Sequence, residues 1–421
     1  MAEKVLNMGL AFFVTVFVAR YLGPEQFGVL AYATSLVALF AVAGHMGLSG
    51  LVVREIVKHP EAREETLGTT MALKSTGIGI GFIALVLFAF FSEELGSDTF
   101  WILLIISASL LFKPFDIIDF WFASQVQAKY TAMARSISLV LTSLFKVVLV
   151  VTGASLIMFA YATTLQSIFG ALLLFYFYTK LKNIPFSHYK VSWQKAKELL
   201  SQGWMVFLGA IFATIYLKVD QVMLKWLVGT EEVGIYAVAA TLSEAWYFIP
   251  TAIIASLFPK LIELRKNNES QFYKRLQQIF DLLFALALGV AIVVTLIATP
   301  LILLFFGETF AESSAILTIH IWAALFIFMR AAFSKWILIE NALMFSLITQ
   351  GFGAVANVGL NLLLIPHYGG EGAAYATLIS YAMASYGALF FYKKTRPIFW
   401  MMSKAMFSPI SYPLSYIKAK L

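Results

Sequence analysis

Charged side chains interrupt several long apolar stretches of this sequence, and their spacing is the first indication of chemistry. One stretch carries Lys113, Asp116 and Asp119, which recur at every third position and therefore share one face of a helix. A lysine at the centre of a bilayer costs about 2.5–3.5 kcal/mol, so it needs a partner, a wet cavity or a route to the interface. Pro114 is expected to kink the helix beside these residues. Two interpretations stay open: a buried set of ion pairs between helices, or the lining of a cavity.

Other charges also lie inside apolar stretches. Together they suggest a cationic cavity for an anionic ligand such as a lipid diphosphate, because lysine is a good point-charge partner for phosphate. The candidate cations are Lys74, Lys113, Lys146 and Lys218. The acids that would form a charge or coupling network with them are Asp116, Asp119, Asp220 and Glu244. Glu244 either pairs with a lysine or carries a proton, and both alternatives stay open.

Some charged and aromatic residues have simpler expected roles. Arg20 and Lys225 lie at the ends of apolar stretches and are expected to reach the interface with their long side chains. His45 and His367 are expected to be interfacial polar groups rather than metal ligands. The side chains that could stack on sugar rings are Trp121, Tyr216 and Trp246. The absence of cysteine excludes disulfides, a thiolate metal site and a cysteine nucleophile.

The composition indicates the class of protein that must position these residues. Of 421 residues, 61% are hydrophobic and 13% are charged, whereas soluble domains contain about 25% charged residues. Continuous apolar runs recur that are long enough to cross a membrane, and helices are the structure such runs adopt in lipid. The twelve runs lie near 4–20, 27–53, 67–91, 99–122, 131–152, 155–179, 203–228, 233–258, 276–306, 313–333, 336–365 and 371–392. The sequence therefore predicts an all-α integral membrane protein, with the first run a span rather than a signal peptide.

Basic residues alternate between the loops and predict the orientation. The loops after even-numbered runs and the two chain ends are basic, whereas the loops after odd-numbered runs carry Arg20 and otherwise acids. Because basic loops stay in the cytoplasm, both termini are expected there. The cytoplasmic basic set is Lys4, Arg54, Lys58, Arg63, Lys129, Arg135, Lys180, Lys182, Lys190, Lys195, Lys197, Lys260, Arg265, Lys266, Lys274, Arg275, Arg330, Lys335, Lys393, Lys394, Arg396, Lys404, Lys418 and Lys420.

An internal repeat divides the chain into halves. Residues 22–33 (LGPEQFGVLAYA) resemble residues 228–239 (VGTEEVGIYAVA), and the tetrapeptide AYAT occurs at both 160–163 and 374–377. Two parallel six-helix lobes related by a pseudo-two-fold axis along the membrane normal are a known transporter plan. The expected domains are an N-lobe at 1–179, a cytoplasmic amphipathic linker at 180–202, a C-lobe at 203–392 and a basic cytoplasmic tail at 393–421.

Several motifs resemble those of Wzx-type polysaccharide flippases in the MOP exporter superfamily. The first hairpin matches at residues 19–28 (ARYLGPEQFG), and the seventh and eighth helices match at 219–224 (VDQVML) and 233–236 (VGIY). The turn between the last two helices matches at 360–366 (LNLLLIP) and 372–377 (GAAYAT). Among the charged candidates, Asp220 is the one placed by a matched motif. The first run is shorter than the family's usual first helix.

The resemblance implies a substrate and a location. The substrate would be an undecaprenyl-diphosphate-linked oligosaccharide repeat unit, moved by alternating access from the cytoplasmic to the outer leaflet for O-antigen, capsule or exopolysaccharide synthesis. The chain would lie in a bacterial or archaeal cytoplasmic membrane, in contact with membrane lipid and with a polysaccharide polymerase and chain-length proteins as partners. It would not be an enzyme, would need no cofactor and no nucleic acid, and would couple to an H⁺ or Na⁺ gradient.

Three alternatives compete with this interpretation. A MATE-type multidrug exporter moves cations, so its cavity would be expected to be acidic. A flippase of peptidoglycan lipid precursors usually has two further helices. A membrane glycan polymerase or glycosyltransferase would be expected to have a sizeable outer loop or catalytic acids near an interface, whereas the loops after odd-numbered runs are short.

Overall fold

The computed structural model describes residues 2–181 and 185–418, with side chains from Leu6 to Ser408. Within this part of the chain every regular element is an α-helix or a 3-10 helix, so the predicted all-helical membrane fold is confirmed. Some basic residues used to orient the chain lie, wholly or by their side chains, outside the described residues: Lys4, Lys182, Lys418 and Lys420.

Ten helical stretches of the described chain are long and apolar enough to cross a membrane. Two of them contain a glycine whose backbone leaves the helical region: Gly23 at φ 72° in α1 (Ala2–Ala41) and Gly369 at φ 52° in α14 (Leu343–Ser385). Glycine adopts such positive φ values without steric cost. Each glycine lies where the sequence predicts a turn between two runs, so the ten stretches cover the twelve predicted runs.

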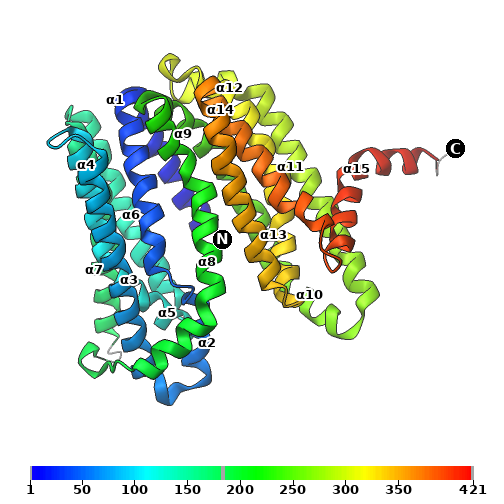
Figure 1. Cartoon of the computed structure of the whole chain (residues 1–421), viewed down its shortest axis with the longest axis horizontal. Coiled ribbons are helices and arrows are strands. Elements are labelled where there is room, and N and C mark those ends of the chain that lie inside the picture. The colour runs from blue at the N-terminus through cyan, green and yellow to red at the C-terminus, as the bar shows by residue number, and fades with distance from the viewer. Residues whose placement is uncertain (1, 182–184, 419–421) are drawn as a thin grey trace. The chain divides into compact units, whose positions relative to one another are not determined.

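Backbone contacts divide the chain into two compact units, Met1–Lys225 and Trp226–Leu421. The first unit contains α1 to α8, coloured blue to green in Figure 1. After α1 its main elements are α2 (Ser49–Lys58), α3 (Arg63–Ser92), α4 (Asp98–Ser107), the 3-10 helix η3 (Ala108–Asp116), α5 (Ile117–Ser124), α6 (Ala128–Val151), α7 (Leu156–Lys180) and α8 (Trp193–Leu227). The division falls near the end of α8, and the lobe boundary at residue 203 stays a prediction.

The end of α1 and the middle of α3 approach each other closely through glycines of α3. A Cβ added at Gly77 would lie 2.4 Å from the carbonyl oxygen of Ala43, and one at Gly81 would lie 2.6 Å from that of Phe40. Small residues let helix backbones touch in this way. The contact fixes the position of α3, and with it Lys74, which precedes Gly77 by one turn.

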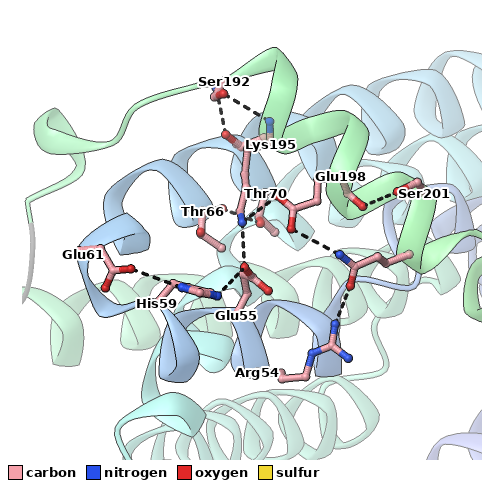
Figure 2. A network of polar contacts seen from close by, with 12 residues as sticks. Arg54, Glu55, His59, Glu61, Thr66, Thr70, Ser192, Lys195, Glu198 and Ser201 are labelled. Carbon is pink, nitrogen blue, oxygen red and sulfur yellow. Dashed lines mark hydrogen bonds and ion pairs between the residues drawn. The ribbon is translucent and has the colours of Figure 1, made fainter.

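The start of α8 is tied to α2 by a network of polar contacts (Figure 2). Lys195 Nζ lies 2.9 Å from Glu55 Oε1, and Arg54 donates a 2.6 Å hydrogen bond to Gln202 Oε1. The basic linker predicted at 180–202 therefore contains the first turns of α8, and Leu199 in these turns is fully buried.

The end of α8 is tied to α3 by a second lysine–carboxylate pair. Lys225 Nζ donates to both carboxylate oxygens of Glu93 at 2.7 Å, and Tyr32 donates to the same carboxylate at 2.8 Å. Lys225 is therefore ion-paired, whereas the sequence predicts only that its side chain reaches the interface. The two ion pairs hold both ends of α8 against the first unit, so the middle of the helix does not require a large apolar contact there.

The second unit forms its own hydrophobic core. Its elements are α9 (Thr230–Glu244), α10 (Phe248–Asn267), α11 (Glu269–Phe305), α12 (Ser313–His320), α13 (Ala324–Ile339), α14 and α15 (Arg396–Lys418). Phe280, Phe328 and Phe333 are fully buried in this core, and α15 adds Ile398 and Met402 to it. The beginning of the predicted tail at 393–421 thus packs as part of the second unit.

Both units tie the turn of their first hairpin to the turn of their last. In the first unit, the Tyr21 hydroxyl donates to the carbonyl of Ala154 at 2.9 Å. In the second, the backbone N–H of Gly370 donates to Glu232 Oε1 at 2.5 Å. The parallel supports the repeat found in the sequence, and the axis relating the lobes stays a prediction.

Replacing Glu93 by Gln should destabilise the first unit, because the largely buried Lys225 ammonium would lose its counter-charge. Removing one partner of a buried pair costs about 3–5 kcal/mol, so the melting temperature of the purified protein in detergent should fall clearly. The double variant Glu93→Gln/Lys225→Gln should recover much of this loss. Glu263→Gln, which removes one partner of the exposed Lys260–Glu263 pair, is the control. Equal melting temperatures for the two single variants would contradict the expectation.

Candidate functional site

A cavity of about 920 Å³ opens in the first unit, between α1, α3, α6, α7, α8 and η3. Its lining is mainly apolar but contains a compact set of charged and polar side chains. The titratable lining residues are His45, Lys74, Lys113, Asp116 and Arg135. Uncharged polar lining residues include Asn7, Thr34, Ser109, Ser138, Gln166 and Ser167. Ligand sites commonly combine apolar walls with a few convergent polar groups in this way.

Lys74 reaches the cavity from α3 and is 6% exposed. Its ammonium lies 5.2 Å from the centre of the Phe120 ring, which is within range of a cation–π interaction. The glycine contact between α3 and α1 fixes the helix that carries it. Lys74 is therefore a buried cation that opens on a cavity, which is one of the solutions expected for a charge in an apolar segment.

Lys113 and Asp116 reach the cavity from η3. Residues three apart lie directly above one another on a 3-10 helix, so the two side chains share a face. Pro114 lies inside η3 and is buried. The kink predicted at this proline takes the form of a 3-10 segment between α4 and α5, and this segment directs the charged pair into the cavity.

Asp119, the third member of the predicted stripe, lies on α5 and forms an ion pair with Arg135 of α6. Arg135 lines the cavity, whereas Asp119 is not among the lining residues. The stripe is thus divided between the two interpretations that the sequence left open. Lys113 and Asp116 line a cavity, and Asp119 belongs to an ion pair between helices.

The charge balance of the cavity is positive. The lining contains three cations, Lys74, Lys113 and Arg135, and one carboxylate, Asp116. Asp119, which is paired with Arg135, compensates part of the positive charge. Such a lining attracts anions and repels cations. Among the described residues, no group of His, Asp and Glu side chains is arranged to hold a metal ion.

The middle of α8 closes one side of the cavity with small side chains. Ala210, Ala213 and Thr214 line it, and their spacing places them on one face of the helix. Because α8 contributes two alanines and a threonine, this wall is built without bulky residues. A ligand can therefore approach the α8 backbone closely.

The other predicted charges lie elsewhere. Arg135 and Leu139 line the cavity from one face of α6, and Lys146 lies on the same face about two turns further along the helix. Lys218 and Asp220 lie on α8 beyond Thr214, and Asp220 is 2% exposed. Glu244 ends α9 in the second unit. The cavity therefore brings together Lys74, Lys113 and Asp116 but not these four residues.

Two titratable lining residues were not identified as site candidates from the sequence. Arg135 was counted among the basic loop residues, although it falls within the predicted run 131–152, and it lies in the second turn of α6. His45, which is expected to be an interfacial polar group, lines the cavity. The sequence signal for Arg135 was an opposite charge, Asp119, on the helix that precedes it.

The aromatic candidates for sugar stacking do not line this cavity. Trp121 is 5% exposed and packs edge-on against Tyr178, with ring centres 6.4 Å apart, in the hydrophobic core of the first unit. Tyr216 and Trp246 are also absent from the lining. The expectation for Trp121 is wrong because a sequence does not show which face of a short helix packs inward.

Comparisons with known sequences place this geometry in a family context. The family model described as "Polysaccharide biosynthesis protein" matches residues 1–265. "Probable flippase AglR" of Haloferax volcanii is 26% identical over 387 residues, covering 88% of this chain and 77% of that protein. "Putative O-antigen transporter" of Shigella flexneri is 25% identical over 325 residues, covering 71% and 73%.

Solved structures share the fold. An inward closed conformation of the lipid II flippase MurJ aligns with a TM-score of 0.73 at 17% identity, over 98% of this chain and 92% of that chain. An inward-facing MATE multidrug transporter of the MOP superfamily aligns with a TM-score of 0.67 at 16% identity, over 94% and 96%. At these identities the likeness shows the fold alone.

Single cysteines should report the charge of the cavity, because the chain has none of its own. Ser138→Cys and Ser167→Cys line the cavity and should react several-fold faster with a negatively charged than with a positively charged methanethiosulfonate. Ser155→Cys, exposed outside the cavity, should show no such preference. Adding Lys74→Gln should weaken the preference at Ser138→Cys. Faster reaction with the positively charged reagent at both lining positions would contradict a cationic cavity.

Proposed function

Because the chain belongs to the polysaccharide biosynthesis protein family, we propose that it flips lipid-linked oligosaccharides across a membrane. The chain is a multi-pass membrane protein, and its family consists of transporters and flippases rather than enzymes. The observation that carries the proposal is the cationic cavity of the first unit. A lipid-linked oligosaccharide carries phosphate between its chain and its sugars, and this group matches the cavity in charge.

The cavity residues have distinct proposed roles. Lys74 and Lys113 bind the diphosphate as point charges. Arg135 offers a planar group with several donors, and Asp119 holds it in place through the ion pair. Asp116 limits the excess positive charge beside Lys113, so that the anion can also leave. Lys146 on α6 and Lys218 on α8 are proposed as further contacts along the path, with Asp220 and Glu244 in the charge network.

The proposed substrate is an undecaprenyl-diphosphate-linked repeat unit, and the proposed direction is from the cytoplasmic to the outer leaflet. The basic loops support this direction, since basic loops stay in the cytoplasm and both termini are expected on the same side. The relatives named as a flippase and an O-antigen transporter support the substrate class. Two units with a repeated pattern of hairpin turns suit alternating access, in which one half rocks against the other.

A multidrug exporter is the competing function, because MATE transporters share this fold. Drug exporters of that group move cations, and a cation would be repelled by Lys74, Lys113 and Arg135. The charge of the cavity therefore favours the flippase. An acidic cavity of the same shape would have favoured the exporter.

Depletion of this protein should cause a complete polyprenol-diphosphate oligosaccharide to accumulate, as measured by lipid mass spectrometry of the cells. The wild-type chain should clear it on re-expression. Lys113→Gln should clear it at least about tenfold more slowly, because losing one charge-assisted contact costs about 1.5–3 kcal/mol. If no such lipid accumulates in cells that make the glycan, the proposed function is wrong.

The matched control is Lys129→Gln, an exposed lysine at the start of α6 that does not line the cavity. It should clear the lipid at the wild-type rate at equal expression. If Lys113→Gln also clears the lipid at that rate, the flippase assignment stands but the role of this lysine does not.

A further inference from the structure

A second cavity, of about 500 Å³, lies at the surface of the first unit between α3, α7 and the loop that follows α7. We call it the aromatic groove. Its lining residues are Gly68, Met71, Ala72, Ser75, Phe115, Phe175, Phe186, Tyr189 and Val191. Ser75 and the hydroxyl of Tyr189 are the polar side-chain groups in this set. The groove is therefore built for hydrocarbon rather than for sugar or phosphate.

The loop that forms one wall of the groove is fixed to α3 by its backbone. A Cβ on Gly68 would lie 2.4 Å from the carbonyl oxygen of Lys190, so the loop approaches α3 where a side chain is missing. The N–H of Lys190 donates to the carbonyl of Glu64 at 3.3 Å, and the N–H of Ser192 donates to Thr69 Oγ1 at 3.0 Å. The groove is thus preformed.

Aromatic contacts hold the same wall from the side of α7. Phe186 stacks on Phe175 with ring centres 5.8 Å apart and lies 4.9 Å from the Tyr189 ring. The hydroxyls of Tyr189 and Tyr178 are 2.9 Å apart, and burial raises the pKa of Tyr189 above its usual range. Tyr189 therefore stays neutral, and the aromatic wall remains apolar. A rigid, preformed site loses little ordering free energy when it binds a ligand.

The groove and the cationic cavity share their walls. On α3, Lys74 lines the cavity and the next residue, Ser75, lines the groove. On α7, Leu174 lines the cavity and Phe175 lines the groove. Phe115 of η3 faces the groove from the segment that directs Lys113 into the cavity. An anion site and a hydrocarbon site are therefore placed back to back.

The rim of the groove carries exposed positive charge. Arg63 is the exposed first residue of α3 and lies five residues before the lining residue Gly68. Lys190 lies between two lining residues, Tyr189 and Val191, and is exposed. Glu64 and Glu65 follow in the first turn of α3, where the helix N-terminus stabilises their charge. A ligand with one apolar chain and an anionic head would fit both the groove and its rim.

We propose that the aromatic groove binds the isoprenoid chain of a polyprenyl phosphate lipid and that Arg63 and Lys190 hold its phosphate. One groove of about 500 Å³ suits a single chain, whereas a phospholipid would have to leave its second chain in the bilayer. The apolar lining, which includes four aromatic rings, suits a hydrocarbon chain. The inference rests on the proposed function, and it assigns to the lipid part of the substrate a waiting site beside the cavity.

Filling the groove should abolish this binding. The purified full chain in detergent would be titrated with undecaprenyl phosphate and, separately, with phosphatidylglycerol, and binding read by native mass spectrometry. Ala72→Phe places a ring in the groove and should weaken undecaprenyl phosphate binding at least tenfold. Ile80→Phe, on the exposed side of the same helix, should leave it unchanged. Unchanged binding in Ala72→Phe, or an equal loss of phosphatidylglycerol binding, would overturn the proposal.

A second variant tests the rim without filling the groove. Arg63→Gln/Lys190→Gln should weaken binding of undecaprenyl phosphate but not of the uncharged polyprenol, at an unchanged melting temperature. If this variant and the wild type bind undecaprenyl phosphate with equal affinity, Arg63 and Lys190 do not hold the phosphate. Lys129→Gln, an exposed lysine that lines neither the groove nor the cavity, should retain binding. If undecaprenyl phosphate binds as expected while depleted cells accumulate no lipid-linked oligosaccharide, the groove stands and the proposed function falls.

Discussion

Positive charge inside apolar helices is the constraint on which the first unit depends. A desolvated ammonium or guanidinium must find an opposite charge, an aromatic face or a wet space. The structure uses each of these: Lys225 pairs with Glu93, and Lys74 lies over Phe120 beside the cavity. Around the cavity, Lys74, Lys113 and Arg135 outnumber the single lining carboxylate, Asp116, so an excess of positive charge gathers there.

The backbone provides the space that these charges need. Glycines of α3 bring that helix against the end of α1, and the 3-10 segment η3 turns Lys113 and Asp116 to the same side. Lysine–carboxylate ties near the two ends of α8 leave its middle to present small residues, including Ala213, to the cavity. Packing in lipid gains little from hydrophobic burial, so close backbone contacts and polar ties define the shape.

The sequence predicts those features that follow from local composition. Continuous apolar runs fix the spans, and turn glycines such as Gly23 fix the breaks. Lys74, Lys113 and Asp116 were identifiable because a charge in an apolar run is conspicuous. Arg135 was not, since a basic residue near the start of a run looks like part of a basic cytoplasmic loop. The expectation that Trp121 stacks on sugar rings is wrong for another reason, because the face of a helix that packs inward depends on neighbours far away in sequence.

The arrangement of two sites on one wall follows from the chemistry of an amphiphile. Phosphate needs cations and hydrogen-bond donors, whereas an isoprenoid chain needs apolar contact, and neither group gains free energy in the environment that suits the other. Helices α3 and α7 resolve this conflict because adjacent residues on a helix point in different directions. Lys74 and Ser75, like Leu174 and Phe175, therefore serve opposite environments while only one residue apart. A carrier for lipid-linked sugars requires such a division, and a carrier for a small soluble cation does not.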